Sequence, residues 1–164
     1  MIIRSEKPSD IDAITNVNVE AFKNHPFSHQ SEHLIVKALR DSGGLVLSLV
    51  AEDESKVIGH IAFSEIKIDG KDCEWYGIGP LAVLPDYQKK GIGSELLRAG
   101  LAQMQEMGAR GCALVGNPVF YTRFGFTSKH GLILDEVPPE NFLVFPFEDE
   151  IPKGITTFHQ AFLI

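Results

Sequence analysis

A short stretch of the sequence, from Gln88 to Gly93, places two lysines and two glycines where a strand-like pattern changes to a helical one. Unpaired backbone N–H groups and the positive end of the helix dipole converge at the start of a helix. Glycine has no Cβ, so an anion can approach the backbone closely there. The stretch therefore predicts a cradle for a phosphate group, with Lys89 and Lys90 adding positive charge around it. The alternative is a tight turn whose glycines serve the backbone geometry alone.

Two better-known phosphate motifs do not describe this stretch. The P-loop pattern G-x-x-x-x-G-K-S/T is absent from the chain. A nominal dinucleotide pattern, G-x-G-x-x-G/A, lies at residues 77–82, but a strand-like segment follows it instead of a helix. We therefore expect neither a P-loop nor a dinucleotide site.

The elements around the cradle form a strand, a helix and a second strand. Apolar residues recur at helical spacing between residues 92 and 107, and a glycine follows them. The segment CALVG at residues 112–116 then has the pattern of a short buried strand. This order predicts a βαβ unit with parallel strands and a right-handed connection.

The rest of the chain supplies further strands and two helices. The segments are a strand at 1–5, helices within 9–21 and 31–44, strands at 45–53, 56–68 and 74–83, and candidate strands at 140–147 and 155–164. The three consecutive strands, joined by short turns, predict an antiparallel meander. The predicted fold class is α/β, with a mixed sheet that is antiparallel in its N-terminal meander, a central parallel strand pair, and flanking helices.

Length and composition suit one globular domain, because the chain has 164 residues, of which 44% are hydrophobic and 23% charged. We expect residues 1–164 to form a single domain, in which residues 129–164 contribute C-terminal strands and loops. No apolar run reaches the roughly 20 residues that span a bilayer, and the N-terminus lacks the apolar core of a signal peptide. We therefore expect a cytoplasmic protein without a membrane partner. Cys73 and Cys112 are expected to be small core residues.

Charge and histidine spacing exclude two further classes of function. The net charge is −7, and residues 131–164 hold six acidic side chains and one lysine. Nucleic-acid binding rests on clustered Lys and Arg, so we expect no nucleic-acid partner. The spacing of His25, His29 and His33 suits metal ligands on one helix face, but Pro26 interrupts the helix that they would need. We therefore expect no metal site.

Two segments, in the same order, resemble motifs of the GNAT superfamily of N-acyltransferases. GPLAVLPDYQKKGIGSELLRAGL, at residues 79–101, contains Gln-x-x-Gly-x-Gly and is similar to the family's acyl-CoA binding signature, Gln/Arg-x-x-Gly-x-Gly/Ala. NPVFYTRFGF, at residues 117–126, resembles the stretch after the family's fifth strand, where a tyrosine precedes a Gly-Phe pair. More narrowly, the pattern from Glu32 to Arg40, together with YTRFGF and the C-terminal strands, is similar to the YhbS-type acetyltransferases.

The resemblance implies where coenzyme A would bind. In this family the backbone amides of the glycine turn hold the pyrophosphate, and the preceding strand hydrogen-bonds the pantetheine arm. The fourth and fifth strands splay apart and the thioester lies in the gap, here between residues 81–83 and 114–117. The implied cofactor-binding residues are Leu81, Ala82, Val83, Gln88, Lys89, Lys90, Gly91, Ile92, Gly93, Ser94, Asn117 and Tyr121.

The resemblance also implies a reaction. An acetyl group would pass from acetyl-CoA to a primary amine of a small molecule or a protein, by direct attack in a ternary complex. Tyr121 matches the family's tyrosine that can protonate the departing thiolate, and Asn117 lies where relatives contact the pantetheine or the acetyl group. The alternatives are a core tyrosine packed among phenylalanines, and a turn residue before Pro118.

The resemblance assigns no general base. Some relatives that acetylate protein lysines carry a glutamate on the fourth strand, where this sequence has Gly77. Many family members relay the proton through water instead. The alternative function is a non-catalytic domain that binds or senses acyl-CoA. A homodimer is a further expectation, because the superfamily often pairs through its C-terminal strands.

Overall fold

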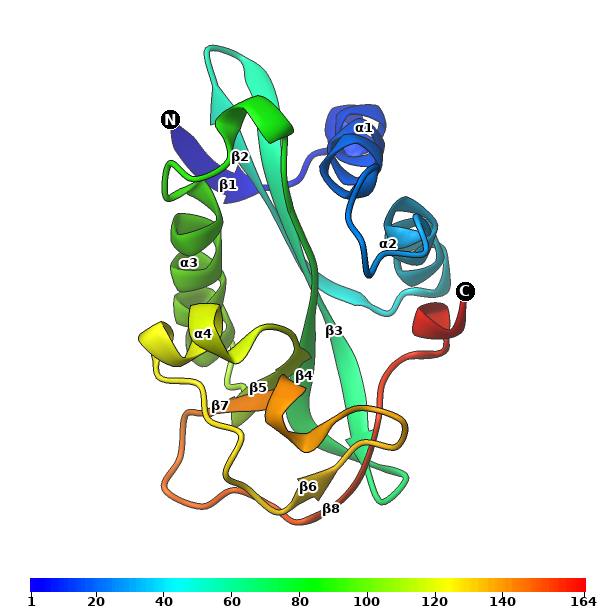
Figure 1. The fold of residues 1–164 in the computed structure, drawn as a ribbon, viewed down its shortest axis with the longest axis vertical. Helices are drawn as coiled ribbons and strands as arrows, with labels where there is room; N and C mark the ends of the chain where they lie inside the picture. The colour runs from blue at the N-terminus through cyan, green and yellow to red at the C-terminus, as the bar shows by residue number, and fades with distance from the viewer.

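The computed structural model describes residues 1–164, and its centre is a twisted mixed sheet (Figure 1). Along the sheet the strands follow the order β1-β2-β3-β4-β5-β7. They are β1 (Ile2–Ser5), β2 (Leu45–Asp53), β3 (Lys56–Ile68), β4 (Lys71–Val83), β5 (Gly111–Val115) and β7 (Phe142–Pro146). Two short strands lie off this path, β6 (Leu132–Ile133) and β8 (Gly154–Thr157), and β8 pairs with the end of β3.

Helices cover both faces of the sheet (Figure 1). The helices α1 (Ile11–Phe22) and α2 (Glu32–Ser42) lie on one face, and α3 (Ile92–Glu106) lies on the other. A single turn, α4 (Pro118–Tyr121), follows β5. None of these helices has both the length and the apolar character that crossing a bilayer requires. The pairing is antiparallel from β1 to β4 and parallel between β4 and β5, which confirms the predicted fold class.

The strands β4 and β5 pair over only part of their length. Their parallel register ends at Gly77, opposite Ala113, and residues 78–83 of β4 have no partner on the β5 side. The register between β3 and β4 shifts at the same place, so β4 contains a bulge at Gly79 and Pro80. A bulge bends and twists the strand that carries it. β4 therefore turns away from β5, and the two strands leave an open slot between them.

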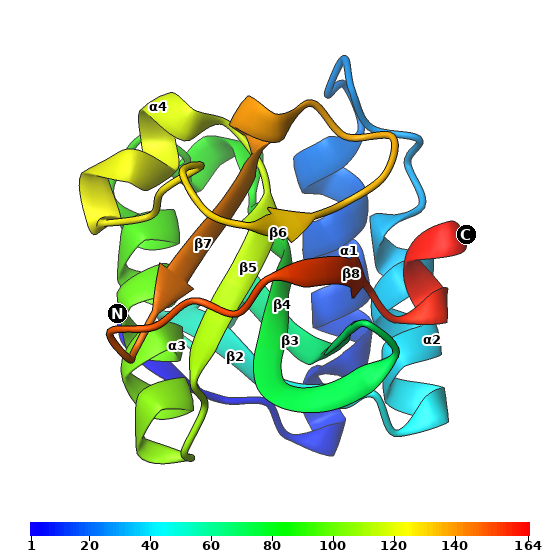
Figure 2. The ribbon, with the colours of Figure 1, turned by 90° about the horizontal axis from the view of Figure 1, so that it is seen from below.

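The end of the chain differs from the predicted strand at residues 155–164. Only β8 is extended, and Gln160–Leu163 form a 3-10 turn beside α2 (Figure 2). The His159 ring accepts a hydrogen bond of 3.0 Å from the Ala161 N–H and so caps this turn. Ala161 is buried against Leu39 of α2. The strand prediction was wrong because a local cap and a contact with a distant helix outweigh the strand pattern.

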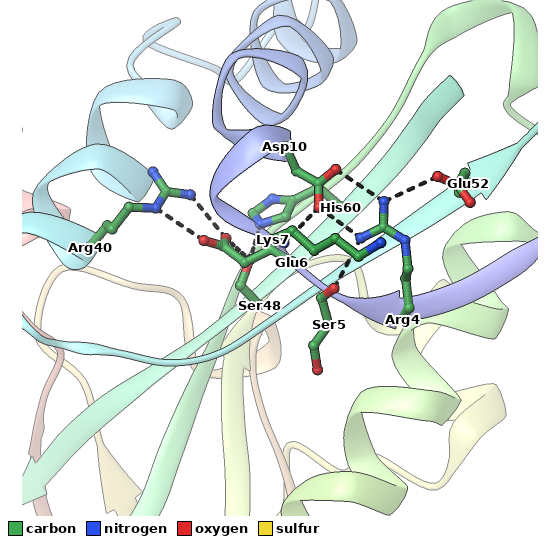
Figure 3. A network of polar contacts seen from close by, with 9 residues as sticks. All are labelled: Arg4, Ser5, Glu6, Lys7, Asp10, Arg40, Ser48, Glu52 and His60. Carbon is green, nitrogen blue, oxygen red and sulfur yellow. Dashed lines mark hydrogen bonds and ion pairs between the residues drawn. The ribbon is translucent and has the colours of Figure 1, made fainter. Parts of the chain in front are cut away.

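A polar network joins β2, β3 and the segment after β1 to the helices α1 and α2, and Figure 3 shows its members His60, Ser48, Glu6 and Arg40. His60 of β3 is fully buried, and its Nε2 lies 2.8 Å from Ser48 Oγ. Its Nδ1 lies 3.2 Å from Nδ2 of Asn18 on α1. Ser48 donates to Glu6, and Arg40 of α2 donates to the same carboxylate at 3.0 Å. Burial lowers the pKa of His60 to about 4, so the ring is neutral and accepts from Asn18 while it donates to Ser48.

A second polar cluster fixes the start of α1 (Figure 3). Arg4 donates to Asp10 at 2.7 and 3.0 Å and to Glu52 at 3.1 Å. The Lys7 N–H donates to Asp10 at 2.7 Å. The hydrogen bonds from Arg4 and then from Lys7 outweigh burial and lower the pKa of the Asp10 carboxyl. The cluster therefore stabilises the fold as long as Asp10 is ionised.

We expect acid to weaken the fold through His60 before it protonates the carboxylates. The pKa of His60 falls from 6.5 to about 4 on folding, so between these values the unfolded chain binds a proton that the folded chain does not. The contribution of neutral His60 to the free energy of unfolding is fully present above pH 6.5. It is lost as the pH decreases toward 4, and the loss is about 3 kcal/mol at most. Urea unfolding at pH 7, 6 and 5 measures this slope.

The matched variants are His60→Gln and His29→Gln, because His29 is exposed. His60→Gln should reduce the pH dependence of the free energy of unfolding by the uptake of about one proton. His29→Gln should leave that pH dependence unchanged. Equal slopes in all three proteins would show that His60 is not held neutral by the fold.

Candidate active site

The glycine turn connects β4 to α3. A 3-10 turn at Pro85–Tyr87 leads to Gln88, whose Nε2 donates to the Val83 carbonyl at 2.9 Å and closes the connection. Lys89 and Gly91 have positive φ angles of 62° and 84°. Gly91 is also the N-cap of α3. The backbone conformation therefore accounts for glycine at position 91.

The backbone N–H groups of residues 89–94 have no partner within the chain. None of them takes part in the hydrogen bonds of turns and caps, and the first N–H groups of a helix have no partner inside it. A Cβ at Gly93 would meet no other atom closer than 3.9 Å, so neither packing nor conformation requires glycine there. Free space beside a row of unpaired N–H groups favours a phosphate cradle over a purely structural turn.

The end of β4 also offers unpaired backbone groups to the slot. The Leu84 N–H donates to β3 at 2.9 Å, and Ala82 lies opposite His60 in the same ladder. Hydrogen-bonded and non-bonded pairs alternate in antiparallel strands, so the backbone of Ala82 bonds to β3. The N–H groups of Leu81 and Val83 consequently point to the other side, toward the slot.

A cavity of about 430 Å³ lies at the glycine turn. The end of β4 and the turn form one part of its lining, and Phe120 and Arg123 form another. The lining residues are Leu81, Val83, Tyr87, Gln88, Lys89, Gly91, Ile92, Gly93, Ser94, Phe120 and Arg123. The structure thus gathers most of the predicted coenzyme-binding residues around one cavity.

Four of the predicted residues lie outside this lining: Ala82, Lys90, Asn117 and Tyr121. Ala82 is buried and bonded to β3. The Nζ of Lys90 lies 5.7 Å from the centroid of the Tyr87 ring. Oδ1 of Asn117 accepts from the Val119 N–H at 2.9 Å and caps α4, as expected for a turn residue. Contacts of all the predicted residues with a ligand, inside and outside this lining, stay predictions.

Tyr121 packs within a cluster of aromatic rings beside β5. Its ring centroid lies 4.9 Å from that of Phe120 and 5.6 Å from that of Phe126, and a Cβ on Gly116 would collide with the ring. Burial raises the pKa of Tyr121 to about 12, so the phenol keeps its proton at neutral pH. The side-chain hydrogen bonds of residues 117–123 do not use its hydroxyl, which leaves it free to donate to a ligand.

Gly77 has no room for a side chain. A Cβ at this position would lie 2.8 Å from the ring of Phe158 and 3.1 Å from Ile66. Phe158 belongs to the segment that follows β8, at the end of the chain (Figure 2). Packing therefore leaves no room for a glutamate side chain at this point of β4.

Sequence reasoning missed Tyr87, Phe120 and Arg123 as lining residues of the cavity. Tyr87 lies in a 3-10 turn, and the other two lie in and just after α4. A local pattern does not say which side chain of a single turn faces a cavity. The one arginine among aromatic residues in FYTRFGF, at residues 120–126, is the signal that points to this segment.

Comparison with known sequences identifies a family. The profile described as "Acetyltransferase (GNAT) domain" matches residues 45–128, from β2 to the segment after α4. Among curated proteins, the chain is 35% identical over 169 residues to "Uncharacterized N-acetyltransferase YhbS" of Escherichia coli (strain K12). That match covers 99% of this chain and 98% of the Escherichia coli protein.

Solved structures show the same similarity. A GNAT family acetyltransferase from Brucella melitensis, in complex with acetyl-CoA, is 43% identical with a TM-score of 0.89, over 98% of this chain and 97% of the other. YhbS from Escherichia coli, in complex with CoA, is 32% identical with a TM-score of 0.87, over 99% of this chain and 92% of the other. The similarity therefore includes the C-terminal segment as well as the glycine turn.

We expect Gly77→Ala to destabilise the protein. The added methyl group meets the Phe158 ring at less than contact distance, and such overpacking costs about 1–3 kcal/mol. Urea unfolding of Gly77→Ala, of Phe158→Ala and of the double variant measures the coupling. In the Phe158→Ala background, Gly77→Ala should lower the free energy of unfolding by a much smaller amount. Strictly additive effects would contradict this packing.

Proposed function

Because this chain belongs to the GNAT family of acetyltransferases, we propose that it transfers an acetyl group from acetyl-CoA to a primary amine of a small molecule or a protein. The amine attacks the thioester directly while both substrates are bound. The observation that carries the proposal is the row of unpaired N–H groups at residues 89–94, which lies at a cavity beside the open end of β4. The Brucella melitensis and Escherichia coli neighbours contain acetyl-CoA and CoA, respectively, which supports this donor.

Two sets of backbone donors suit two parts of the coenzyme. We assign the N–H groups of residues 89–94 to its diphosphate, which the positive end of the α3 dipole also attracts. We assign one of the two unpaired N–H groups of Leu81 and Val83 to the pantetheine arm, whose amides are able to pair with the edge of β4 as a strand does. The side chains of Leu81, Val83 and Phe120 supply an apolar surface around the arm.

The same strand edge serves the chemical step. Attack on the thioester places negative charge on the carbonyl oxygen, and a preorganised N–H donor stabilises that charge. An unpaired N–H of Leu81 or Val83 is the donor that we assign to this role. Since packing excludes a carboxylate at Gly77, the amine passes its proton to water.

Tyr121 is the residue that we assign to the leaving thiolate. A free thiol has a pKa of about 8.5, whereas burial raises the pKa of Tyr121 to about 12. The phenol is thus protonated whenever the thiolate forms. Because complete proton transfer from this phenol is unfavourable, Tyr121 stabilises the thiolate by donating a hydrogen bond, and the thiolate takes its proton from water.

Calorimetric titration with acetyl-CoA tests the cradle. We expect saturable binding to the wild-type protein and a loss of about 100-fold or more in Gly93→Asp, because a carboxylate there fills the open space and repels the diphosphate. Ala102→Asp, at an exposed position of the same helix, is the control and should bind normally. The absence of binding to the wild-type protein at millimolar acetyl-CoA would contradict the proposal.

Release of free thiol from acetyl-CoA, across a panel of primary amines, tests the role of Tyr121. Tyr121→Phe should lower turnover by roughly 100-fold, since it removes the hydrogen bond to the thiolate, and should leave the affinity for acetyl-CoA nearly unchanged. Tyr76→Phe is the matched control, because Tyr76 lies in the paired part of β4, opposite Cys112 of β5, and has no role in the proposed reaction. Unchanged turnover in Tyr121→Phe would remove Tyr121 from the reaction.

A further inference from the structure

Cationic side chains without carboxylate partners gather around the cavity. They are Lys56, Lys89, Lys90, Arg98 and Arg123. None of them belongs to an ion pair of the chain, and no carboxylate lines the cavity. In a protein with a net charge of −7, this is a local excess of positive charge. Such an arrangement attracts a polyanion.

Arg123 differs from the other cations in being both held in place and directed at the cavity. Its guanidinium carbon lies 5.0 Å from the ring centroid of Phe120 and 5.7 Å from that of Phe124. Its Nε donates to the Phe120 carbonyl at 3.3 Å. The aromatic rings and this hydrogen bond restrict the side chain, while the terminal nitrogens keep their donors for a ligand.

The diphosphate does not need Arg123. The N–H groups of residues 89–94, the dipole of α3 and Lys89 already lie together on the glycine turn, whereas Arg123 comes from the segment after α4. Coenzyme A carries one more phosphate, a monoester on the 3′ carbon of its ribose. A terminal phosphate of this kind has free oxygens that accept two parallel hydrogen bonds from a guanidinium group.

We propose that Arg123, held against Phe120 and Phe124, binds the ribose 3′-phosphate of coenzyme A and makes the protein select coenzyme A thioesters over thioesters that lack this phosphate. This inference rests on the proposed function, because it requires the diphosphate to occupy the glycine turn. It adds a specificity determinant that lies outside the glycine motif.

Calorimetric titration with CoA and with 3′-dephospho-CoA tests the inference. The wild-type protein should bind CoA at least about 10-fold more tightly than 3′-dephospho-CoA. Arg123→Gln should weaken CoA binding by about the same factor and leave 3′-dephospho-CoA binding unchanged, so that the ratio approaches 1. Arg123 is exposed, so thermal unfolding should show an unaltered fold.

Arg98→Gln is the matched control, because Arg98 lies 4.9 Å from the Phe124 ring centroid and does not line the cavity. It should preserve the wild-type ratio. If Arg123→Gln weakens the binding of CoA and of 3′-dephospho-CoA equally, Arg123 contacts the diphosphate and the inference is overturned. The inference is also overturned if the ratio of the two affinities approaches 1 in Arg98→Gln alone. Failure of the wild-type protein to bind either ligand would overturn the proposed function as well, whereas tight but equal binding of both would overturn this inference alone.

Discussion

The rest of the structure depends on one constraint, which is that the strand β4 continues beyond the point at which its pairing with β5 ends. Its pairing with β5 ends at Gly77, and a bulge at Gly79 and Pro80 turns it aside. A backbone group that is buried without a partner is costly, so such an edge persists only where solvent or a ligand takes its hydrogen bonds. The glycine turn at residues 89–94 presents further unpaired N–H groups just beyond this edge. One interruption of a ladder therefore yields a line of donors that runs from a strand into a helix.

The other edge of β4 is held firmly, which keeps the slot open. β3 pairs with β4 up to Val83, and His60 lies opposite Ala82 with both of its ring nitrogens hydrogen-bonded. Because the imidazole is neutral, this network joins α1 to the sheet without burying an unpaired charge. The charged pair of Glu6 and Arg40 lies at its partly exposed end, where ionisation is less costly. The layer of α1 and α2 thereby supports the strand whose free edge forms the site.

Local patterns predicted those parts of the site that lie close together in the sequence. The glycine turn, the meander and the βαβ unit follow from short-range periodicity, and the structure contains all three. The sequence did not reveal that Phe158 fills the space beside Gly77, because that contact joins segments far apart in the chain. It did not place Arg123 on the cavity wall either, since the direction of a side chain after a single helical turn depends on tertiary packing. Asn117 illustrates the same limit. An asparagine suits a helix N-cap, which the structure shows, as well as it suits a contact with a ligand, so the residue type alone does not distinguish the two roles.

The absence of a side chain at Gly77 bears on how the amine acceptor that we propose would lose its proton. An alkyl amine has a pKa of about 10 in water, so it approaches the site as a cation. Burial of the amine against the bound coenzyme disfavours its charged form and lowers this pKa. A glutamate beside the amine would instead hold it as an ammonium ion by pairing with it. For the proposed acceptor, burial and the packing of Phe158 at Gly77 would therefore act in the same direction, toward a neutral amine that is able to attack.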